Sequence, residues 1–451
     1  MASAHLHRTL GTPTNEKKWT YSAWIKRSQY TSGHGQFLIA CFTDASNRGR
    51  VYIEDGASSQ LEVADRVSGS FDLQKKTSAS LRDESGWYHI VVGHDRTIST
   101  PVTNMYINGV LQTSFAGDNT VAQNAATSWN KSGSTMLIGK YGGGAQYFSG
   151  LMAHVHFCDG YLYAASNFGE TDTTTGIWKP KTAPSVTYGN NGFFLKFDNS
   201  ANMGLDSSGE SNNFTTSGTI IQPKDTPSNV FATLNPLTKD GGGAKTYSNV
   251  NTTVLESADS WTTAHSTLGV TTGKWYYEGK VTYSNNQEAY LGACSQQTIQ
   301  DRVNSTHYLG QTTGSVGYYT GNGSYYKGAG AVSYGSAVSG GDIVGVALDL
   351  DNNFIYFSIN GTWQNSGNPT SGASGTNGIS LPSGMTSGDS IFLSVSPNQS
   401  TINCNFGNGY FGTTAVSSAQ NPDDGIGIFE YDVPAGYRAL CTKSINAEEY
   451  S

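Results

Sequence analysis

Carboxylates, histidines and aromatic side chains are the residues of this 451-residue sequence that could do chemistry. Glu54 and Asp55 are adjacent, so on a strand they would point to opposite faces, and Asp349 and Asp351 flank a turn. Neither pair has the spacing of two catalytic acids on one face. The signatures Gly-x-Ser-x-Gly, His-Glu-x-x-His, Cys-x-x-Cys and the Walker loop do not occur. The sequence therefore predicts a protein that is not an enzyme.

Two pairs of histidines have the spacing that places both imidazoles on one face of a strand: His5 with His7, and His154 with His156. No carboxylate or cysteine joins either pair at ligand spacing. We therefore interpret both pairs as solvent-facing polar ladders, with a metal site as the alternative.

Two other segments look like ligand-binding loops. Residues 349–353, Asp-x-Asp-x-Asn, begin like a calcium loop but lack the glycine and the distal glutamate that complete one, and a hairpin turn explains them. The glycines at 142–144 make a poor phosphate cradle, because no helix follows to add its dipole. Neither segment predicts a bound cofactor.

Aromatic residues in Gly-, Asn- and Ser-rich surroundings are the strongest binding candidates. Lectins pack aromatic faces on sugar rings and bind the hydroxyls with amides and carboxylates. The residues that we expect to bind a glycan or receptor in this way are Trp129, Asn130, Tyr141, Tyr147, Tyr325, Tyr326 and Trp363. Each aromatic ring could instead cap a core edge or pack on a neighbouring subunit.

Composition restricts the fold and the partners. Charged residues make up 13% of the chain, aromatics 12%, and there are 55 glycines, which favours many short strands joined by polar turns. A net charge of −8 leaves no broad basic face, so we expect no nucleic acid partner. No apolar run approaches the ~18 residues of a membrane span and no leader opens the chain, so we expect neither membrane insertion nor secretion.

The five cysteines are odd in number and widely scattered. They are Cys41, Cys158, Cys294, Cys404 and Cys441. This pattern predicts reduced, buried thiols in a chain that folds in a cytoplasm.

The segment Gly341–Trp363 carries the strongest strand signal. Apolar residues alternate with small or polar ones on both sides of the turn at 351–353, whose residues tolerate positive φ. A two-residue loop at 351–352 predicts three apolar pairs across the hairpin: Leu348–Ile355, Val346–Phe357 and Val344–Ile359. We expect this hairpin to be core.

The same alternation predicts a set of strands in the N-terminal half, and no helical period persists. The predicted strands are Trp19–Ser28, Gln36–Phe42, Gly49–Glu54, Trp87–Asp95, Met105–Gln112 with a turn at Asn108-Gly109, Met136–Lys140, Ser149–Asp159 and Gly192–Phe197. Residues 223–247 are rich in Pro and Gly and lack alternation, which is typical of a linker or wrapping segment. The predicted domains are therefore 1–222 and 248–451.

These segments carry family resemblances. The series Trp19–Ser28, Trp87–Asp95, Met105–Leu111 and Gly150–Asp159 resembles the laminin-G-like, concanavalin A-type jelly-roll lectin domain. The central hairpin, with Gly273–Glu278 upstream, resembles a SPRY-type sandwich. Together they imply an all-β fold of two concanavalin A-like jelly-roll β-sandwich domains in tandem.

The connecting segments resemble those of marine bacteriophage virion proteins. They are residues 167–172, 176–180, 206–214 and 225–236, and the closing segments 405–407 and 434–440 match phage versions of the SPRY-type module. The resemblance implies a protein on the exterior of a virion that is assembled in a host cytoplasm.

The lectin resemblance also bears on catalysis and metals. Glucanase relatives carry Glu-x-Asp-x-x-Glu on one strand, and that motif is absent here. Because the first and last strands of jelly rolls often pair, the four histidines could converge. Calcium occurs in laminin-G-like domains, so an ion near Asp95 or Asn108 is an alternative to a protein without cofactors.

We therefore expect a tail-fibre or spike component that binds a host surface glycan or receptor and other virion structural proteins. We expect a homo-oligomer, with a trimer favoured. The alternatives are a capsid decoration protein, a glycan depolymerase and a cellular SPRY-type interaction module.

Overall fold

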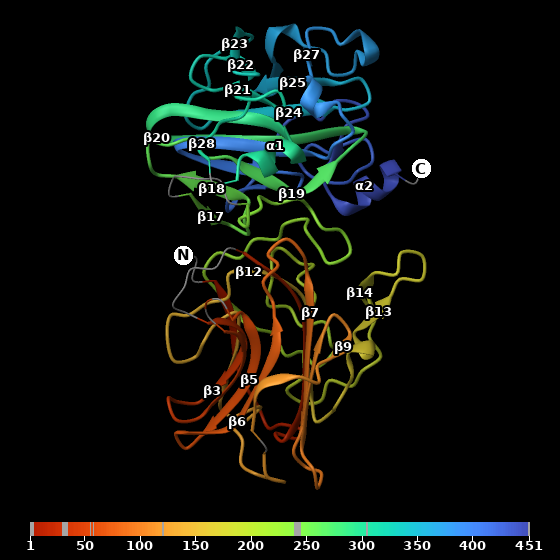
Figure 1. Cartoon of the computed structure of the whole chain (residues 1–451). Helices are drawn as coiled ribbons and strands as arrows, with labels where there is room; N and C mark the ends of the chain where they lie inside the picture. The colour runs from red at the N-terminus through yellow and green to blue at the C-terminus, as the bar shows by residue number, and fades with distance from the viewer. Residues whose placement is uncertain are drawn as a thin grey trace. The chain divides into compact units, whose positions relative to one another are not determined.

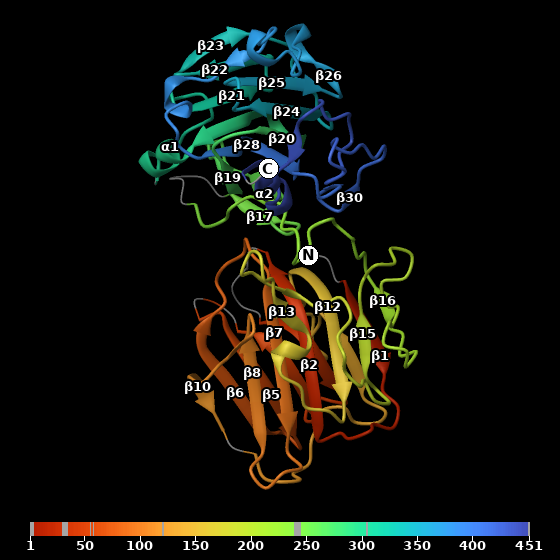
Figure 2. The same cartoon turned by 90° about the vertical axis from the view of Figure 1, so that its right-hand side faces the viewer.

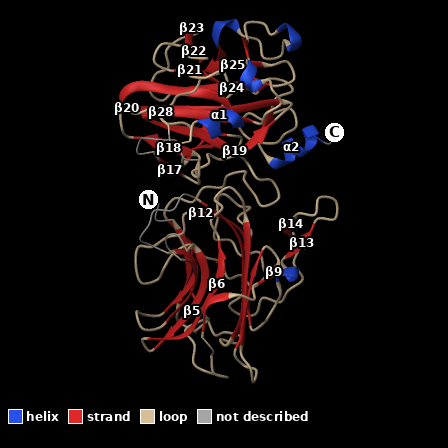
Figure 3. Cartoon of the chain, in the orientation of Figure 1, coloured by secondary structure: helices blue, strands red, loops and turns tan. Residues whose placement is uncertain are grey.

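The computed structural model describes residues 4–28, 35–54, 56, 58–119, 121–238, 245–303 and 305–449, with the backbone alone at 284–287. The chain divides into two units, Met1–Gln222 and Pro223–Ser451. Nearly all of the regular structure is β-strand, with a few short helices (Figure 3). The predicted all-β class, with two β-sandwich domains in tandem, is confirmed.

The N-terminal unit is a sandwich of two antiparallel sheets. The eight-stranded sheet has the order β10-β6-β5-β4-β3-β11-β1-β16 and the six-stranded sheet the order β15-β12-β2-β7-β8-β9. Figure 1 shows the two layers, with β3, β5 and β6 in one and β7 in the other, and Figure 2 shows β2, β12 and β15 side by side.

The strands of the eight-stranded sheet are β1 (His5–Thr9), β3 (Gln36–Phe42), β4 (Arg48–Ile53), β5 (Gln60–Val67), β6 (Ser70–Ser80), β10 (Phe115–Asp118), β11 (Thr135–Ile138) and β16 (Thr215–Ser217). Those of the six-stranded sheet are β2 (Lys18–Arg27), β7 (Tyr88–Asp95), β8 (Val102–Ile107), β9 (Val110–Leu111), β12 (Gly150–Asp159) and β15 (Phe193–Leu195). A two-stranded sheet of β13 (Gly169–Thr171) and β14 (Trp178–Pro180) follows the short 3₁₀-helix Ala165–Asn167.

The core of this unit lies between the two sheets, where one face of each strand is buried. Val51 and Val63 come from the eight-stranded sheet, and Tyr21 and Val92 from the six-stranded sheet. Burying such side chains is the main stabilising term of a sandwich, at roughly 1.5–3 kcal/mol each. The strands predicted for this half are confirmed, with bounds shifted by no more than three residues.

The C-terminal unit is built on one long antiparallel pair, β20 (Lys274–Ser295) and β28 (Ile391–Asn405). The first half of β20 pairs with β24 (Ile343–Asp349) and the second half with β21 (Ser315–Tyr319). The pairing with β28 shifts between Tyr283 and Glu288. This strand pair therefore ties both halves of a 13-stranded sheet together.

The other strands of this sheet are β17 (Thr246–Ser248), β18 (Thr253–Glu256), β19 (Ala264–Val270), β22 (Ser324–Lys327), β23 (Gly330–Ser333), β25 (Phe354–Ile359), β26 (Thr362–Trp363), β27 (Ile379–Ser380) and β31 (Arg438–Ala439). A separate small hairpin joins β29 (Tyr410–Phe411) to β30 (Thr414–Ala415). The helices are α1 (Gln296–Asp301), α2 (Thr442–Glu449) and the 3₁₀-helices Gln364–Ser366, Gly372–Ser374 and Ser383–Met385.

The register predicted for the central hairpin is confirmed. The structure pairs Leu348 with Ile355, Val346 with Phe357 and Val344 with Ile359, and all but Ile359 are fully buried. The predicted two-residue loop is wrong, since the strands end at Asp349 and Phe354 and leave a four-residue turn. The turn is widened because its side chains are engaged: Asp349 accepts a hydrogen bond from the amide of Asn352, and Asp351 accepts one from the backbone N–H of Gly273.

The segment at 223–247 packs on the C-terminal unit over much of its length. Phe231 and Leu234 are buried and form bridges with Cys441 and Ser266. The glycines of this segment, at 241–243, lie outside the described residues. All five cysteines are free and buried, as predicted. No helix among the described residues is long and apolar enough to cross a bilayer.

Replacing Phe357 by Asp is expected to unfold the C-terminal unit, because it puts a charge into a fully buried site and removes a ring whose loss alone costs roughly 3–5 kcal/mol. Thermal melting followed by circular dichroism measures the effect. Val332→Asp on the exposed strand β23 is the control and should leave the melting curve almost unchanged. An unchanged melting curve for Phe357→Asp would contradict the assignment of this hairpin to the core.

Candidate functional site on the outer face of the eight-stranded sheet

Alternation leaves the outer face of the eight-stranded sheet with polar and aromatic side chains. On β4, the buried Gly49, Val51 and Ile53 alternate with half-buried neighbours. Cross-strand pairing arranges the outer side chains in three rows: Phe37–Tyr52–Glu62–Lys76, His7–Leu137–Ala40–Arg50–Ala64–Gln74, and Phe42–Arg48–Arg66–Phe71. We call this surface the arginine face.

Arg50 lies at the centre of the arginine face and rests on aromatic rings. Its guanidinium carbon is 4.8 Å from the ring centre of Tyr52, 5.4 Å from that of Phe71 and 5.9 Å from that of Tyr141. Among the described residues, Arg50 has no hydrogen-bond or ion-pair partner. Cation–π contact holds the side chain in place and leaves its N–H donors unused.

The neighbouring rings and arginines extend this arrangement. Phe37 stacks on Tyr52 and on Tyr141, with ring centres 5.0 and 4.8 Å apart. Arg48 lies 5.6 Å from the ring centre of Tyr141 and donates to the Ala45 carbonyl, while its Nε is buried without a partner. A stack of aromatic rings therefore carries at least two guanidinium groups.

Glu62 is the buried acid of the arginine face. The residue is 0% exposed, its Oε1 accepts a hydrogen bond from Gln74 Nε2 at 3.1 Å, and its carboxyl group also has a side-chain hydrogen bond with Tyr52. Burial raises the pKa of Glu62, while Tyr52, Gln74 and the Arg50 charge oppose that rise and the Glu54 charge adds to it. Glu54 forms an ion pair with Lys76 at 2.9 Å.

A loop formed by residues 139–149 lies on the arginine face and brings two predicted site residues to it. Tyr141 stacks on Phe37, and Tyr147 lies 5.9 Å from His5, whose ring is 5.7 Å from that of His7. A side chain at Gly142 would overlap Phe42, so glycine allows this close approach. The structure therefore brings together Tyr141, Tyr147 and the predicted pair His5 and His7.

Unsatisfied polar atoms gather on this face and its loop. Buried side-chain atoms without a hydrogen-bond partner here are His7 Nδ1, Arg48 Nε, Arg50 Nε and Gln146 Oε1. Such atoms are rare in folded proteins, because each costs about 1–3 kcal/mol. Atoms of the same kind also occur elsewhere in the described chain, for example at Trp19, Tyr21 and His265.

The prediction that Trp129 and Asn130 are exposed binding residues is wrong. Trp129 is 0% exposed, and its ring lies 4.4 Å from that of Trp19 in the core. Asn130 is also 0% exposed and donates to the buried carboxylate of Asp159 at 2.6 Å. The polar sequence around them forms a loop that inserts these two side chains between the sheets.

The remaining predicted aromatics belong to the C-terminal unit and do not form one site. Tyr325 and Tyr326 are neighbours on β22, so their rings point to opposite faces: Tyr325 packs edge-on against Tyr334 and Tyr326 against Tyr290. Trp363 packs edge-on on Tyr276, with ring centres 6.5 Å apart. All three predicted residues are half-buried.

The alternative in which the four histidines converge does not occur, and the interpretation of His154 and His156 as a solvent-facing ladder is wrong for His156, which is buried. His5 and His7 lie on β1, which pairs with β11 and β16, whereas His154 and His156 lie on β12 of the other sheet. His156 is buried and shares a 3.0 Å hydrogen bond with the Tyr188 hydroxyl. No cluster of three metal-ligating side chains occurs among the described residues.

The two residues considered for calcium are both engaged in structural contacts. Asp95 forms an ion pair with Lys18 at 3.1 Å and accepts hydrogen bonds from Thr97. Asn108 occupies a hairpin turn with φ 49° and accepts a hydrogen bond from the His89 backbone. Their oxygens hold the local backbone in place.

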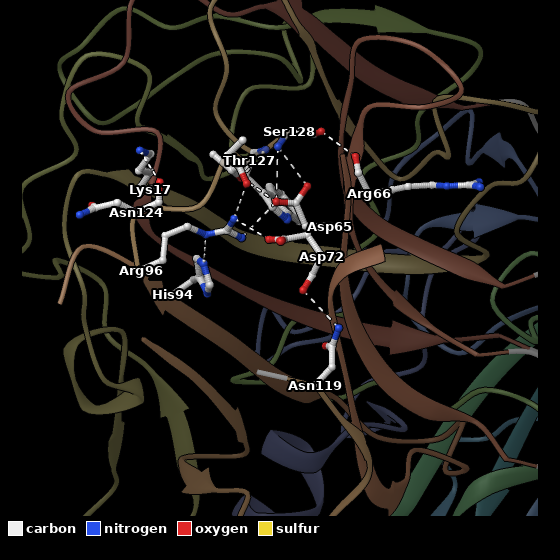
Figure 4. Close-up of polar contacts among 12 residues, drawn as sticks. Lys17, Asp65, Arg66, Asp72, His94, Arg96, Asn119, Asn124, Thr127 and Ser128 are labelled. Carbon is white, nitrogen blue, oxygen red and sulfur yellow. Dashed lines mark hydrogen bonds and ion pairs between the residues drawn. The ribbon is translucent and has the colours of Figure 1, made fainter. Parts of the chain in front are cut away.

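A second polar cluster in the N-terminal unit is structural and mostly buried, with Asp72 half-buried at its edge (Figure 4). Arg96 donates to Asp65 Oδ2 at 3.1 Å, to Asp72 Oδ2 at 2.8 Å and to His94 Nε2 at 2.9 Å. Asp65 also accepts bonds from Thr127 and from the backbone of Ser128, at 2.7 and 3.0 Å. With its donors and acceptors paired, this cluster offers nothing to a ligand.

The charges of this cluster shift the neighbouring pKa values. Burial raises the pKa of Asp65, and the Arg96 charge opposes that rise. Burial and then the Arg96 charge lower the pKa of His94 to about 3, so the imidazole is neutral and can accept the Arg96 hydrogen bond. The cluster links β5 of one sheet to the end of β7 in the other.

Sequence reasoning missed the central residues of the arginine face. The alternation Arg48-x-Arg50-x-Tyr52 was a usable signal, since it places the three side chains on one strand face. Glu62 was harder to find, because the charges in Gln60–Val67 conceal the apolar alternation of that strand.

Comparison with known proteins agrees with this architecture. Residues 3–166 match the laminin-G-like family described as the concanavalin A-like lectin/glucanases superfamily, and residues 274–378 match the SPRY domain family. The chain therefore carries two different β-sandwich domains. The N-terminal one is a concanavalin A-like domain and the C-terminal one is a SPRY domain.

Among curated proteins, none matches the chain. Similar solved structures include the SPRY domain of human HERC1, with 13% identity over 38% of this chain and 96% of that chain and a TM-score of 0.29. Another is a heptameric SAP-like pentraxin from Limulus polyphemus, with 19% identity over 36% of this chain and 72% of that chain and a TM-score of 0.27.

Asp65→Asn is expected to destabilise the N-terminal unit by about 3–5 kcal/mol, because it leaves Arg96 buried without its fully buried counter-charge. Urea unfolding of the full chain measures the change. The control is Asp118→Asn, which removes an exposed ion pair with Lys75 and should cost under about 1 kcal/mol. Equal effects of the two substitutions would contradict a structural role for the buried pair.

Proposed function

We propose that the N-terminal unit binds a negatively charged glycan on the arginine face. The observation that carries this proposal is Arg50, a half-buried guanidinium that rests on three rings with no hydrogen-bond or ion-pair partner among the described residues. Arginine's planar fork matches carboxylate and sulfate groups, and its affinity rises where water is partly excluded.

The surrounding side chains supply the rest of a sugar site. Tyr52 and Tyr141 are half-buried, and the parts of their rings that Phe37 and the arginines leave uncovered could contact a pyranose. Concanavalin A-like and SPRY domains are binding folds, which supports binding of a carbohydrate or a protein as the coarser function.

The connecting segments resemble those of phage virion proteins, and this resemblance supports a more specific biological role. We propose that the chain is an oligomeric tail-fibre or spike component on the exterior of a virion and that its ligand is an acidic polysaccharide of the host surface. A capsid decoration protein is the alternative, and it would contact other virion proteins through the same two units. Affinity for acidic glycans in the purified protein favours the first role, and its absence favours the second.

A glycan depolymerase is not proposed, because Glu62, the acid whose pKa burial raises, is 0% exposed and cannot reach a glycosidic bond from its position in the structure.

Arg50→Gln is expected to lower the affinity for an acidic glycan roughly 10- to 100-fold, because it removes a charged hydrogen-bond donor worth about 1.5–3 kcal/mol. Isothermal titration with polygalacturonate and dextran sulfate measures the loss, and uncharged dextran should bind neither protein. Lys181→Gln, which removes the same charge from a loop after β14, is the matched control. Wild-type affinity in Arg50→Gln would refute the site.

Binding of dextran sulfate should weaken as pH rises. The pKa of Glu62 is raised in the folded protein above its ordinary value of 4.5. At a pH just above 4.5 the carboxyl therefore still carries its proton, and it becomes charged only at a higher pH. Its negative charge beside Arg50 then repels the sulfate groups, whose own charge is constant across this range. The stability that the protonated carboxyl contributes is present below pH about 4.5 and is lost as pH rises through the folded pKa.

The measurement is a titration series from pH 4 to pH 8 with wild type and Glu62→Gln. The variant should show affinity that varies little with pH, because glutamine does not titrate. An equal pH dependence in the two proteins would place the titrating group elsewhere.

A further inference from the structure

A layer of aromatic rings covers part of the C-terminal sheet on the side away from its main core. On β20, Ala289, Leu291 and Ala293 point into that core, so Tyr290 points to the opposite face. We call the rings gathered around it the tyrosine layer: Trp261, Tyr290, Tyr308, Tyr319 and Tyr326. Tyr290 is 4% exposed and the other four are half-buried, so their edges reach the surface.

The rings of this layer contact Tyr290 in two ways, two stacked on it and two edge-on. Tyr290 is stacked on Tyr308 and on Tyr319, with ring centres 4.8 and 4.9 Å apart. Trp261 and Tyr326 meet Tyr290 edge-on, at 4.9 and 5.3 Å. A planar group that reaches the exposed part of the parallel rings can stack on them.

Two carboxylates lie at the hydroxyl end of Tyr319. The Tyr319 hydroxyl donates to Glu288 Oε1 at 2.9 Å, and Asn398 Nδ2 donates both to Glu288 Oε2 at 3.1 Å and to Asp259 Oδ1 at 3.2 Å. Asn398 is 3% exposed, and its Oδ1 is a buried acceptor without a partner. Two negative charges and one open acceptor therefore adjoin the rings.

Within the described residues, no cationic side chain of this chain forms an ion pair with these two carboxylates. Glu288 and Asp259 take part in none of the ion pairs of the described chain. Among the described residues of this unit, the cation–π contacts are those of Lys245 with Tyr247 and of Lys274 with Tyr437. Neither contact involves the tyrosine layer. The arginine face of the N-terminal unit shows the same chemistry with the cations present.

We propose that the tyrosine layer is a docking site for an arginine side chain of a protein partner. The guanidinium packs on the exposed ring surface of Tyr319 and Trp261, and its N–H fork donates to Glu288 and Asp259. Arginine fits better than lysine, because only a planar group both stacks on rings and donates in a fork. This site is independent of glycan binding, since its charge is opposite and it lies in the other unit.

The experiment is isothermal titration of the full chain with a hexa-arginine peptide, compared with hexa-lysine and with hexa-citrulline, the neutral isostere of arginine. Glu288→Gln keeps the shape of the side chain and its bond from Tyr319 while removing the charge. Asp432→Asn, an exposed residue elsewhere in the unit, is the control for net charge. Trp261→Leu tests the rings, and unchanged melting temperatures show that each variant folds.

Hexa-arginine should bind more tightly than hexa-lysine, and hexa-citrulline should not bind. Glu288→Gln and Trp261→Leu should each lower the affinity about tenfold or more, while Asp432→Asn and Arg50→Gln change it less than about twofold. Equal losses in Glu288→Gln and Asp432→Asn, or equal affinities for the arginine and lysine peptides, would reduce the effect to net charge and overturn the proposal.

Discussion

This structure depends on one constraint, which is that successive side chains of a strand point to opposite faces of the sheet. A sandwich buries one face of every strand, and the alternation of side chains then commits the neighbouring residues to the other face. On β4, the burial of Val51 and Ile53 places Arg50 and Tyr52 outside. On β20, the burial of Leu291 places Tyr290 outside. Both candidate binding surfaces are therefore consequences of core formation, and each is held by strands that cannot turn without exposing the core.

Buried carboxylates solve a different problem, the attachment of loops to these sheets. Asp159 accepts hydrogen bonds from the backbone of Thr14, Asn15 and Asn191, and Glu278 accepts them from Glu430 and Tyr431. A carboxylate that accepts several backbone N–H groups satisfies donors that an apolar side chain would leave unpaired. These acids are saturated by the chain itself. Glu62 differs from them, because its hydrogen bonds come from the side chains of Gln74 and Tyr52 on the same sheet.

The sequence predicted the strands and the hairpin register well, because alternation is a local signal that survives without knowledge of the partner strand. It failed where the decisive neighbour is distant in the chain. Trp129 stands among polar residues, yet Gly49 on β4 leaves the space into which its ring packs. Glu62 stands in a strand rich in charge, and only the pairing with Tyr52 and Lys76 shows that it is enclosed. Local polarity indicated exposure in both cases, and tertiary packing overrode it.

A net charge of −8 conceals an uneven distribution of charge. Arg48, Arg50 and Arg66 stand on one sheet face, while Glu288 and Asp259 adjoin rings that have no cation of their own. The arginine face is too small, and too close to Glu62, to neutralise the run of phosphates that nucleic acid binding requires. It suits a ligand whose negative groups are spaced apart on rings, because the same surface offers aromatic faces between its charges. That combination distinguishes an acidic sugar chain from a phosphate backbone.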